Sequence, residues 1–138
     1  MITWGPTSIR EFELKQEDRQ LRETFTWSVR ELRSYRELAA EGREMGHCVY
    51  SYAKSCRSGS TSIWSLGLEN EKGQRQRILT IAVEPRARAV TQVRGRFNAL
   101  PGGKTNKKNL ARAYQRLLAK SQNVLGQWMS NEFLSKTY

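Results

Sequence analysis

The side chains best suited to chemistry gather in one stretch, residues 41–56, with the sequence EGREMGHCVYSYAKSC. It contains the only histidine of the chain, His47, and both cysteines, Cys48 and Cys56. Imidazole and thiol groups serve proteins as proton donors and acceptors, nucleophiles and metal ligands. The stretch is therefore the first candidate for a catalytic site, with His47 as general acid or base and Cys48 as a second reactive group.

The spacing within this stretch limits those roles. Adjacent residues on a helix point about 100° apart, so His47 is poorly placed to activate Cys48 directly. The eight steps from Cys48 to Cys56 span about 12 Å of helix, too far for a disulfide. Structural zinc prefers four ligands in paired short spacings, and neither C-x-x-C nor H-x-x-x-H occurs. We expect no metal and no cofactor, and for each cysteine the alternative is a small buried apolar residue.

A second group of polar side chains occupies residues 92–98, QVRGRFN. Gln92 and Arg94 share one face of a predicted strand end, because side chains alternate along a strand. Gly95 permits close approach of the backbone to a partner. Amide and guanidinium groups suit base edges and phosphates, and an aromatic ring can stack on a base. The residues expected to contact nucleic acid here are Arg94, Arg96 and Asn98; the alternative is an exposed strand end with a bulge glycine.

The charge of the chain is concentrated in its C-terminal part. The formal net charge is +11. Residues 1–84 are nearly neutral, with 13 basic and 12 acidic residues, whereas residues 85–138 contain 11 basic residues and one acid, Glu132. Such a basic half attracts polyanions through counterion release, whereas ordinary soluble surfaces intersperse both signs. The distribution therefore favours a nucleic-acid partner, with general solubilisation as the alternative.

The N-terminal third predicts two short strands after a flexible start. Residues 1–8 are expected to form a loose arm. Alternation of polar and apolar residues predicts strands over 9–15 and 24–29, joined by a polar turn at 16–20. These strands are expected to form a hairpin, with a helix through 9–23 as the alternative.

Two helices are predicted around the reactive stretch. Ser34 and Glu37 form the S-x-x-E capping-box pattern, which predicts a helix that begins there and ends or bends near Gly46. A second helix is expected over 47–56. Its apolar face would contain Cys48, Val49, Tyr52, Ala53 and Cys56, with His47 on the other side.

Residues 61–95 predict a meander of three antiparallel strands. Residues 63–68 alternate between small and large apolar side chains, and the tetrapeptide NEKG at 70–73 is typical of a hairpin turn. The apolar run at 78–83 indicates a central strand, and the chain returns over 89–93.

The chain is expected to end in a long amphipathic helix over 107–133. Its apolar stripe would contain Leu110, Ala113, Tyr114, Leu117, Leu118, Leu125 and Trp128. A basic ridge at spacing four would contain Lys108, Arg112, Arg116 and Lys120. Lys104 lies in the preceding glycine-rich loop, which lacks the spacing of a P-loop and is expected to add to the basic surface.

Length and composition suit one α+β domain over residues 1–138 with a modest core. Hydrophobic residues make up 38% of the chain, and no apolar run approaches the roughly 20 residues of a membrane span. The N-terminus has no secretory pattern, and two cysteines without such a signal favour the reducing cytoplasm. We therefore expect a cytoplasmic protein with no membrane partner.

Four motifs occur in a fixed order within residues 27–101. They are E-G-x-x-M-x-H-C-V-x-x-Y at Glu41–Tyr52, I-x-S-L at Ile63–Leu66, L-T-I-x-V at Leu79–Val83, and Q-x-R-G-x-x-N-x-x-P at Gln92–Pro101. This set resembles the PcfJ-like family, small proteins or C-terminal domains carried by conjugative elements, plasmids and phages. The resemblance implies a mobile-element setting and draws attention to His47, Cys48, Tyr52, Gln92, Arg94, Gly95 and Asn98. The chain departs from the pattern at Tyr50, where a small residue is expected and a bulky ring would narrow a pocket or serve as a contact.

Three functions fit these patterns. The first is a nucleic-acid-binding protein of a mobile element, with DNA or RNA as partner; its contact residues would be Arg94, Arg96, Asn98, Lys104, Lys108, Arg112, Arg116 and Lys120. The second is an enzyme acting on nucleic acid or nucleotides, with His47 as acid–base and Cys48 and Gln92 as further catalytic candidates. The third is an adaptor that docks on an acidic protein partner through the same basic half.

Overall fold

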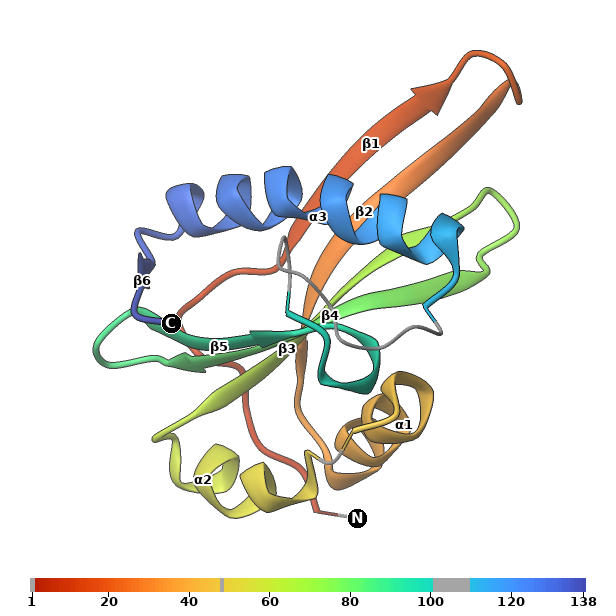
Figure 1. The fold of residues 1–138 in the computed structure, drawn as a ribbon. Helices are drawn as coiled ribbons and strands as arrows, with labels where there is room; N and C mark the ends of the chain where they lie inside the picture. The colour runs from red at the N-terminus through yellow and green to blue at the C-terminus, as the bar shows by residue number, and fades with distance from the viewer. Residues whose placement is uncertain (1, 48, 101–109) are drawn as a thin grey trace.

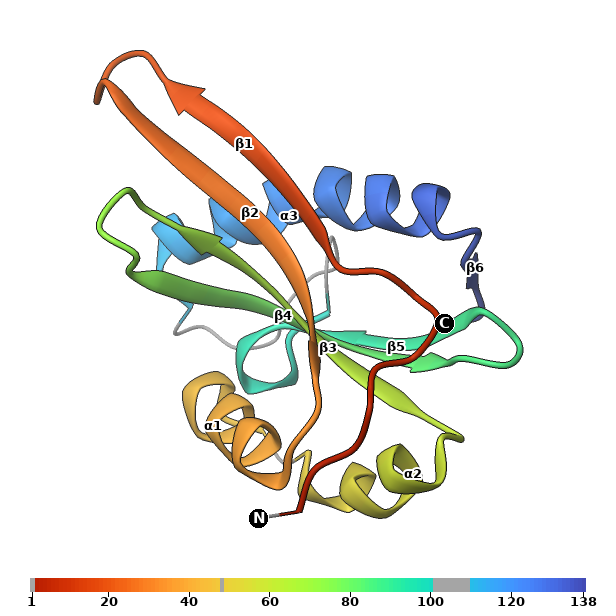
Figure 2. The same ribbon diagram turned by 180° about the vertical axis from the view of Figure 1, so that it is seen from behind.

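A computed structural model of the chain describes residues 2–47, 49–100 and 110–138 and shows an α+β fold (Figure 1). The strands are β1 (Phe12–Asp18), β2 (Glu23–Leu32), β3 (Ser62–Glu69), β4 (Arg75–Glu84), β5 (Ala89–Arg94) and β6 (Ser135–Lys136). The helices are α1 (Tyr35–Met45), α2 (Ala53–Ser58) and α3 (Arg112–Asn131), with short 3-10 turns η1 (Tyr50–Tyr52) and η2 (Arg96–Asn98). Figures 1 and 2 show α3 on one side of a curled sheet, hereafter the α3 face, and α1 and α2 on the other, hereafter the α1 face.

All six strands belong to one sheet and follow one another across it in chain order. Strands β1 to β5 pair antiparallel, and β6 pairs parallel with β5. The predicted meander is confirmed as β3, β4 and β5, and the two N-terminal strands extend the same sheet. No sequence pattern predicts β6, which is held in place by the bond from the Ser135 N–H to the Arg88 carbonyl, 2.8 Å.

The N-terminal hairpin forms, but its first strand is displaced from the prediction. It spans Phe12–Asp18 in place of 9–15, and the alternative helix over 9–23 is absent. The carboxylate of Asp18 accepts the N–H groups of Gln20 and Leu21 at 2.9 and 3.0 Å. The turn therefore begins after Asp18, and residues expected in the turn extend the strand instead.

The arm at residues 2–8 is docked and not loose, which corrects the prediction. Trp4 donates its indole N–H to the Leu32 carbonyl at 3.1 Å, and Thr3 forms a bridge with Ser34. Ile9, at the end of the arm, is buried in the main core. The arm is fixed because an apolar side chain and an indole N–H both find partners on the sheet.

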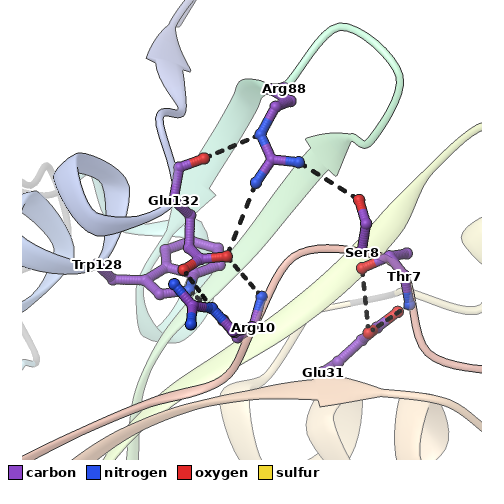
Figure 3. Close-up of polar contacts among 7 residues, drawn as sticks. All are labelled: Thr7, Ser8, Arg10, Glu31, Arg88, Trp128 and Glu132. Atoms are coloured by element: carbon purple, nitrogen blue, oxygen red, sulfur yellow. Dashed lines mark hydrogen bonds and ion pairs between the residues drawn. The ribbon is translucent and has the colours of Figure 1, made fainter.

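The end of α3 is tied to the arm and to the β4–β5 turn through Glu132 (Figure 3). Its carboxylate accepts the Arg10 N–H at 2.7 Å and forms ion pairs with the side chains of Arg10 and Arg88, at 3.3 and 3.7 Å. Trp128 donates its indole N–H to the Arg10 carbonyl at 2.8 Å. The single acid of the basic half is thus buried in a structural contact.

The main core lies between the sheet and α3. Trp64 and Trp128 pack with ring centroids 4.9 Å apart, and both are fully buried. Other members of this core come from the four strands β2 to β5 and from α3: Trp27, Val29, Leu66, Ile81, Val83, Val93, Tyr114, Leu118 and Leu125. Ala113, expected on the apolar stripe, is exposed.

The α1 face carries a smaller apolar cluster, which α1 covers; the helix itself was predicted. Ser34 accepts the Glu37 N–H at 3.0 Å, so the capping box is confirmed, and Glu37 in turn accepts the Arg33 N–H. The helix ends at Gly46 in the left-handed conformation, with φ of 66°. The buried members of the cluster are Leu32, Leu38, Val49, Cys56, Ile63 and Ala82.

Two helix predictions need correction at their ends. The helix expected over 47–56 is divided into η1 and α2, because the chain leaves α1 through Gly46 and the His47 N–H bonds the Gly42 carbonyl at 3.1 Å. The predicted C-terminal helix over 107–133 begins at Arg112, and residues 107–109 lie outside the described part. It ends at Asn131, since Phe133 has a φ of 55°. No helix of the described residues is long and apolar enough to cross a membrane.

Candidate functional site

The reactive stretch and the QVRGRFN segment meet in one pocket on the α1 face. The pocket has a volume of about 170 Å³. Its lining comes from the end of α1, from η1, from three strands and from η2: His47, Val49, Ser51, Tyr52, Ile63, Thr80, Ala82, Gln92, Arg94 and Asn98. Ile63, Thr80 and Ala82 lie side by side on β3 and β4, so the sheet provides the floor and the motif residues provide the polar walls.

His47 is held at the pocket by the two glycines before it. A Cβ at Gly42 would lie 2.8 Å from the His47 carbonyl oxygen, so glycine permits the backbone to fold back against α1. Gly46 supplies the left-handed turn. The Nε2 atom of His47 is buried and has no hydrogen-bond partner among the described residues.

The environment of His47 favours its neutral form. Burial lowers the pKa of the imidazole, and an interaction with its own backbone carbonyl only partly offsets this.

Gln92 and Arg94 project from β5 onto the same face, as predicted. In the strand register, Gln92 lies opposite Ala82 and Arg94 lies opposite Thr80. The Tyr52 hydroxyl donates to Gln92 Oε1 at 2.7 Å, which orients the amide and leaves its NH₂ as donor. Arg94 donates one bond, from Nη1 to the Val93 carbonyl at 3.0 Å, and no ion pair links it to another described residue.

The η2 turn closes one side of the pocket against the end of α1. Phe97 and Asn98 both have positive φ, 54° and 62°. The Phe97 ring packs on Gly46, where a Cβ would lie 2.6 Å from two ring atoms. This contact holds the turn so that Asn98 lines the pocket while remaining exposed.

Gly95 has an internal role that its motif did not reveal. A Cβ there would lie 2.5 Å from the Tyr114 hydroxyl. That hydroxyl donates to the Ile78 carbonyl at 2.8 Å and accepts the Arg96 N–H at 2.7 Å. The glycine thus admits a side chain of α3, where the sequence predicted close approach of an external partner.

A buried carboxylate, Glu41, lies behind the pocket; it opens the first motif, but its burial was not predicted. Glu41 is 0% exposed, and it accepts hydrogen bonds from Arg77 Nε at 2.9 Å and from the Thr80 hydroxyl at 2.5 Å. Burial raises the pKa of Glu41, while Thr80 and Arg77 act in the opposite direction. The sequence signal for the burial of Glu41 was its helical spacing: it lies three residues after Leu38 and four before Met45, which are both buried.

Arg75 is a second, partly buried charge on the α1 face. Its guanidinium lies across Gly67, where a Cβ would be 2.7 Å from Cζ, and it bonds the Ser28 hydroxyl and the Ser65 carbonyl. Burial, reinforced by neighbouring Arg30, lowers the pKa of Arg75 to about 10. Arg75 therefore has a structural role, since it joins β4 to Ser28 of β2 and Ser65 of β3.

The remaining predicted contact residues are divided between two sides of the molecule. Arg112, Arg116 and Lys120 are exposed on α3, across the sheet from the pocket. Arg96 is only partly exposed, with its guanidinium 5.2 Å from the centre of the Tyr114 ring. The predicted residues outside the described part are Cys48, Lys104 and Lys108. Within residues 2–47, 49–100 and 110–138, no cluster of three metal-ligating acid, histidine or cysteine side chains occurs.

The cysteine that the structure describes is not a reactive thiol. Cys56 is buried in the smaller apolar cluster, as one of the two alternatives predicted. Burial, with a contribution from the charge of Glu31, raises the pKa of this thiol to about 11. A protonated, enclosed thiol is a poor nucleophile, so Cys56 serves packing.

Comparison with known proteins gives one match. The model of the PcfJ-like protein family matches residues 8–114, which include the hairpin, α1, the pocket and the first turn of α3. Because the match covers most of the chain, the chain belongs to the PcfJ-like family. No curated protein and no solved structure matches it.

Proposed function

We propose that this member of the PcfJ-like family binds nucleic acid through the exposed basic ridge of α3, formed by Arg112, Arg116 and Lys120. These residues lie at spacing four and are all exposed, so they form one line along the helix. No ion pair links any of the three to another described residue. An unpaired row of cations along one helix is suited to a phosphate backbone.

The observation that carries this proposal is the position of Glu132, the one acid among residues 85–138. Glu132 is 5% exposed and is engaged by Arg10 and Arg88. Its charge is therefore neutralised inside the fold, and the sequence has no other acid after Glu84. No acid of residues 85–138 therefore opposes the ridge, although Glu17 and Asp18 of β1 line one pocket with Lys120.

The start of α3 adds to the same potential. Its first turn contains no acidic residue, and Ala111 at the N-cap provides no side-chain hydrogen bond. The positive end of the helix dipole thus remains uncompensated beside Arg112 and one turn from Arg116. Both contributions favour an anionic partner at this end of the helix.

Fluorescence anisotropy with labelled single-stranded DNA, duplex DNA and RNA tests the proposal. For about three phosphate contacts, affinity is expected to fall roughly 20- to 40-fold between about 50 and 200 mM salt. The double variant Arg112→Glu/Arg116→Glu reverses the ridge and should abolish binding. A matched control, Arg57→Glu/Arg86→Glu, makes the same charge change at exposed positions on α2 and the β4–β5 turn and should retain it.

Two results would overturn the proposal. One is equal loss of binding in both double variants, which would show a response to net charge and not to the ridge. The other is no binding to any of the three nucleic acids at low salt. In that case the ridge would be assigned to an acidic protein partner.

A further inference from the structure

We infer that a groove between the β1–β2 hairpin and α3 takes an unpaired base, so that the basic ridge selects single-stranded over duplex nucleic acid. The inference rests on the proposed function, because it places the phosphates of the same strand on the ridge. It adds the class of nucleic acid, which contacts to phosphates alone do not decide.

The groove lies on the α3 face, where the hairpin extends past the helix (Figure 1). Its lining comes from the hairpin, from β3 and β4 and from α3. Its volume is about 660 Å³, the share of about 22 water molecules in the liquid. A base together with its sugar therefore fits in the groove.

The groove and the ridge share Lys120. This lysine is the last residue of the ridge and also lines the groove. Leu117, one helical turn before it, lines the groove as well and is partly buried. A strand whose phosphates follow Arg112 and Arg116 toward Lys120 therefore brings a base to the groove, because the base and the phosphate belong to one nucleotide.

The floor of the groove is aromatic and apolar. Trp27 is buried in the main core, whereas Phe25, two residues before it on β2, is partly exposed in the groove. Leu68 of β3 lies opposite Trp27 in the strand register and is also partly exposed. Phe25 is thus the aromatic ring that a base can reach, and stacking on a ring tolerates any sequence because every base has a π face.

Amide side chains surround this floor. Gln16, Gln20 and Gln76 line the groove and are exposed. Gln16 lies opposite Phe25 in the strand register, and its Oε1 accepts the indole N–H of Trp27 at 2.9 Å, so its NH₂ is left to donate. Amides offer both donors and acceptors, as do the edges of an unpaired base.

The charges of the groove suit a neutral ring and not a phosphate. Two acids, Glu17 and Asp18, and two basic residues, Arg19 and Lys120, line it, so their formal charges cancel. A phosphate inside the groove would meet both carboxylates, whereas an uncharged base is not repelled. The phosphates are therefore kept on the ridge and the base is directed inward. Only an unpaired strand does this readily, since the bases of a duplex are paired and stacked inside it.

Fluorescence anisotropy of the whole chain at about 200 mM salt tests the inference, because contacts to phosphates are weak there. The probes are a labelled single strand, the same strand with abasic sites at its central positions, and the corresponding duplex. The abasic strand keeps every phosphate, so the ordinary strand should bind at least about fivefold more tightly than it does. The ordinary strand should also bind more tightly than the duplex.

The variant Phe25→Leu removes the ring but keeps an apolar side chain. It should bind the ordinary strand no more tightly than the abasic strand, and its affinity for the abasic strand should equal that of the wild type, which also shows that it folds. The matched control is Phe12→Leu, which makes the same change at a partly buried position of β1 outside the groove. It should keep the wild-type preference.

The outcomes separate the groove from the ridge. Equal affinity of the wild type for the ordinary and abasic strands, or an unchanged preference in Phe25→Leu, would overturn the inference while the ridge remains a nucleic-acid site. The groove would then be assigned to a protein segment. Retention of both strands by Arg112→Glu/Arg116→Glu would overturn the proposed function, and the inference with it. DNA and RNA strands of one sequence, compared in the same assay, identify which nucleic acid supplies the base.

Discussion

The two faces of the sheet are built from the same strands but have opposite character. On the α3 face, tryptophans and aliphatic residues form one continuous core. On the α1 face, a small apolar cluster sits beside buried charges and a polar pocket. The alternation is visible within β5, where Val93 packs under α3 while Gln92 and Arg94 line the pocket. One face therefore provides most of the stability, which allows the other to hold polar groups that contribute little to folding.

The largest effect is expected from breaking the α3 face. Trp128→Ala removes a fully buried ring against Trp64 and an indole bond to the Arg10 carbonyl. It should lower the free energy of unfolding by about 3–5 kcal/mol in urea titrations. Cys56→Ala removes one buried sulfur from the smaller cluster and should cost only about 1 kcal/mol. Equal costs for the two substitutions would contradict the unequal division of stability between the faces.

The next effect concerns the buried charge on the α1 face. Glu41→Ala leaves Arg77 and the Thr80 hydroxyl without their acceptor and should cost about 3 kcal/mol. The double variant Glu41→Leu/Arg77→Met should cost less than the sum of the single variants Glu41→Leu and Arg77→Met, because no charge is then left unpaired. Urea unfolding of the four proteins measures this coupling. Additive costs would show that the pair does not act as a unit.

The local elements of both faces could be predicted, because their signals lie within a few residues. The capping box of Ser34 and Glu37 and the alternation along β3 predicted α1 and the meander. The docked arm and β6 could not be predicted, since they depend on contacts such as that between Arg10 and Glu132, 122 residues apart. A short polar arm has no periodicity of its own, and its conformation is decided by the surface it meets.

The site was predictable in its residues but not in its assembly. Alternation placed Gln92 and Arg94 on one face, and rarity drew attention to His47. Their meeting in one pocket depends on how the end of α1 packs on the sheet. The burial of Glu41 was not predicted because a charged helix residue is normally exposed, and only its spacing from apolar residues indicated otherwise.

A third prediction concerns the close contact between Gly95, which follows β5, and the Tyr114 side chain of α3. Gly95→Ala would bring a Cβ to 2.5 Å from the Tyr114 hydroxyl, and Tyr114→Phe would leave the Ile78 carbonyl and the Arg96 N–H unpaired. Each should cost about 1–3 kcal/mol. The double variant should cost less than their sum, because removal of the hydroxyl removes the clash. A residual cost is expected, since Leu118 lies 3.2 Å from the same Cβ.

The smallest effect is expected from the protonation of His47, and it distinguishes the pocket from the core. Burial lowers the pKa of His47 below its ordinary 6.5. As the pH falls from 8 through 6.5, the unfolded chain takes up this proton before the folded one does, so the folded state loses stability. Glu31 and Glu41 have raised pKa values and act in the opposite sense at lower pH, because the folded state protonates them first. The quantity to measure is therefore the difference in unfolding free energy between wild type and His47→Gln at each pH. The wild type should become less stable relative to the variant as the pH falls, whereas a constant difference would show that the imidazole lies in a solvent-like environment.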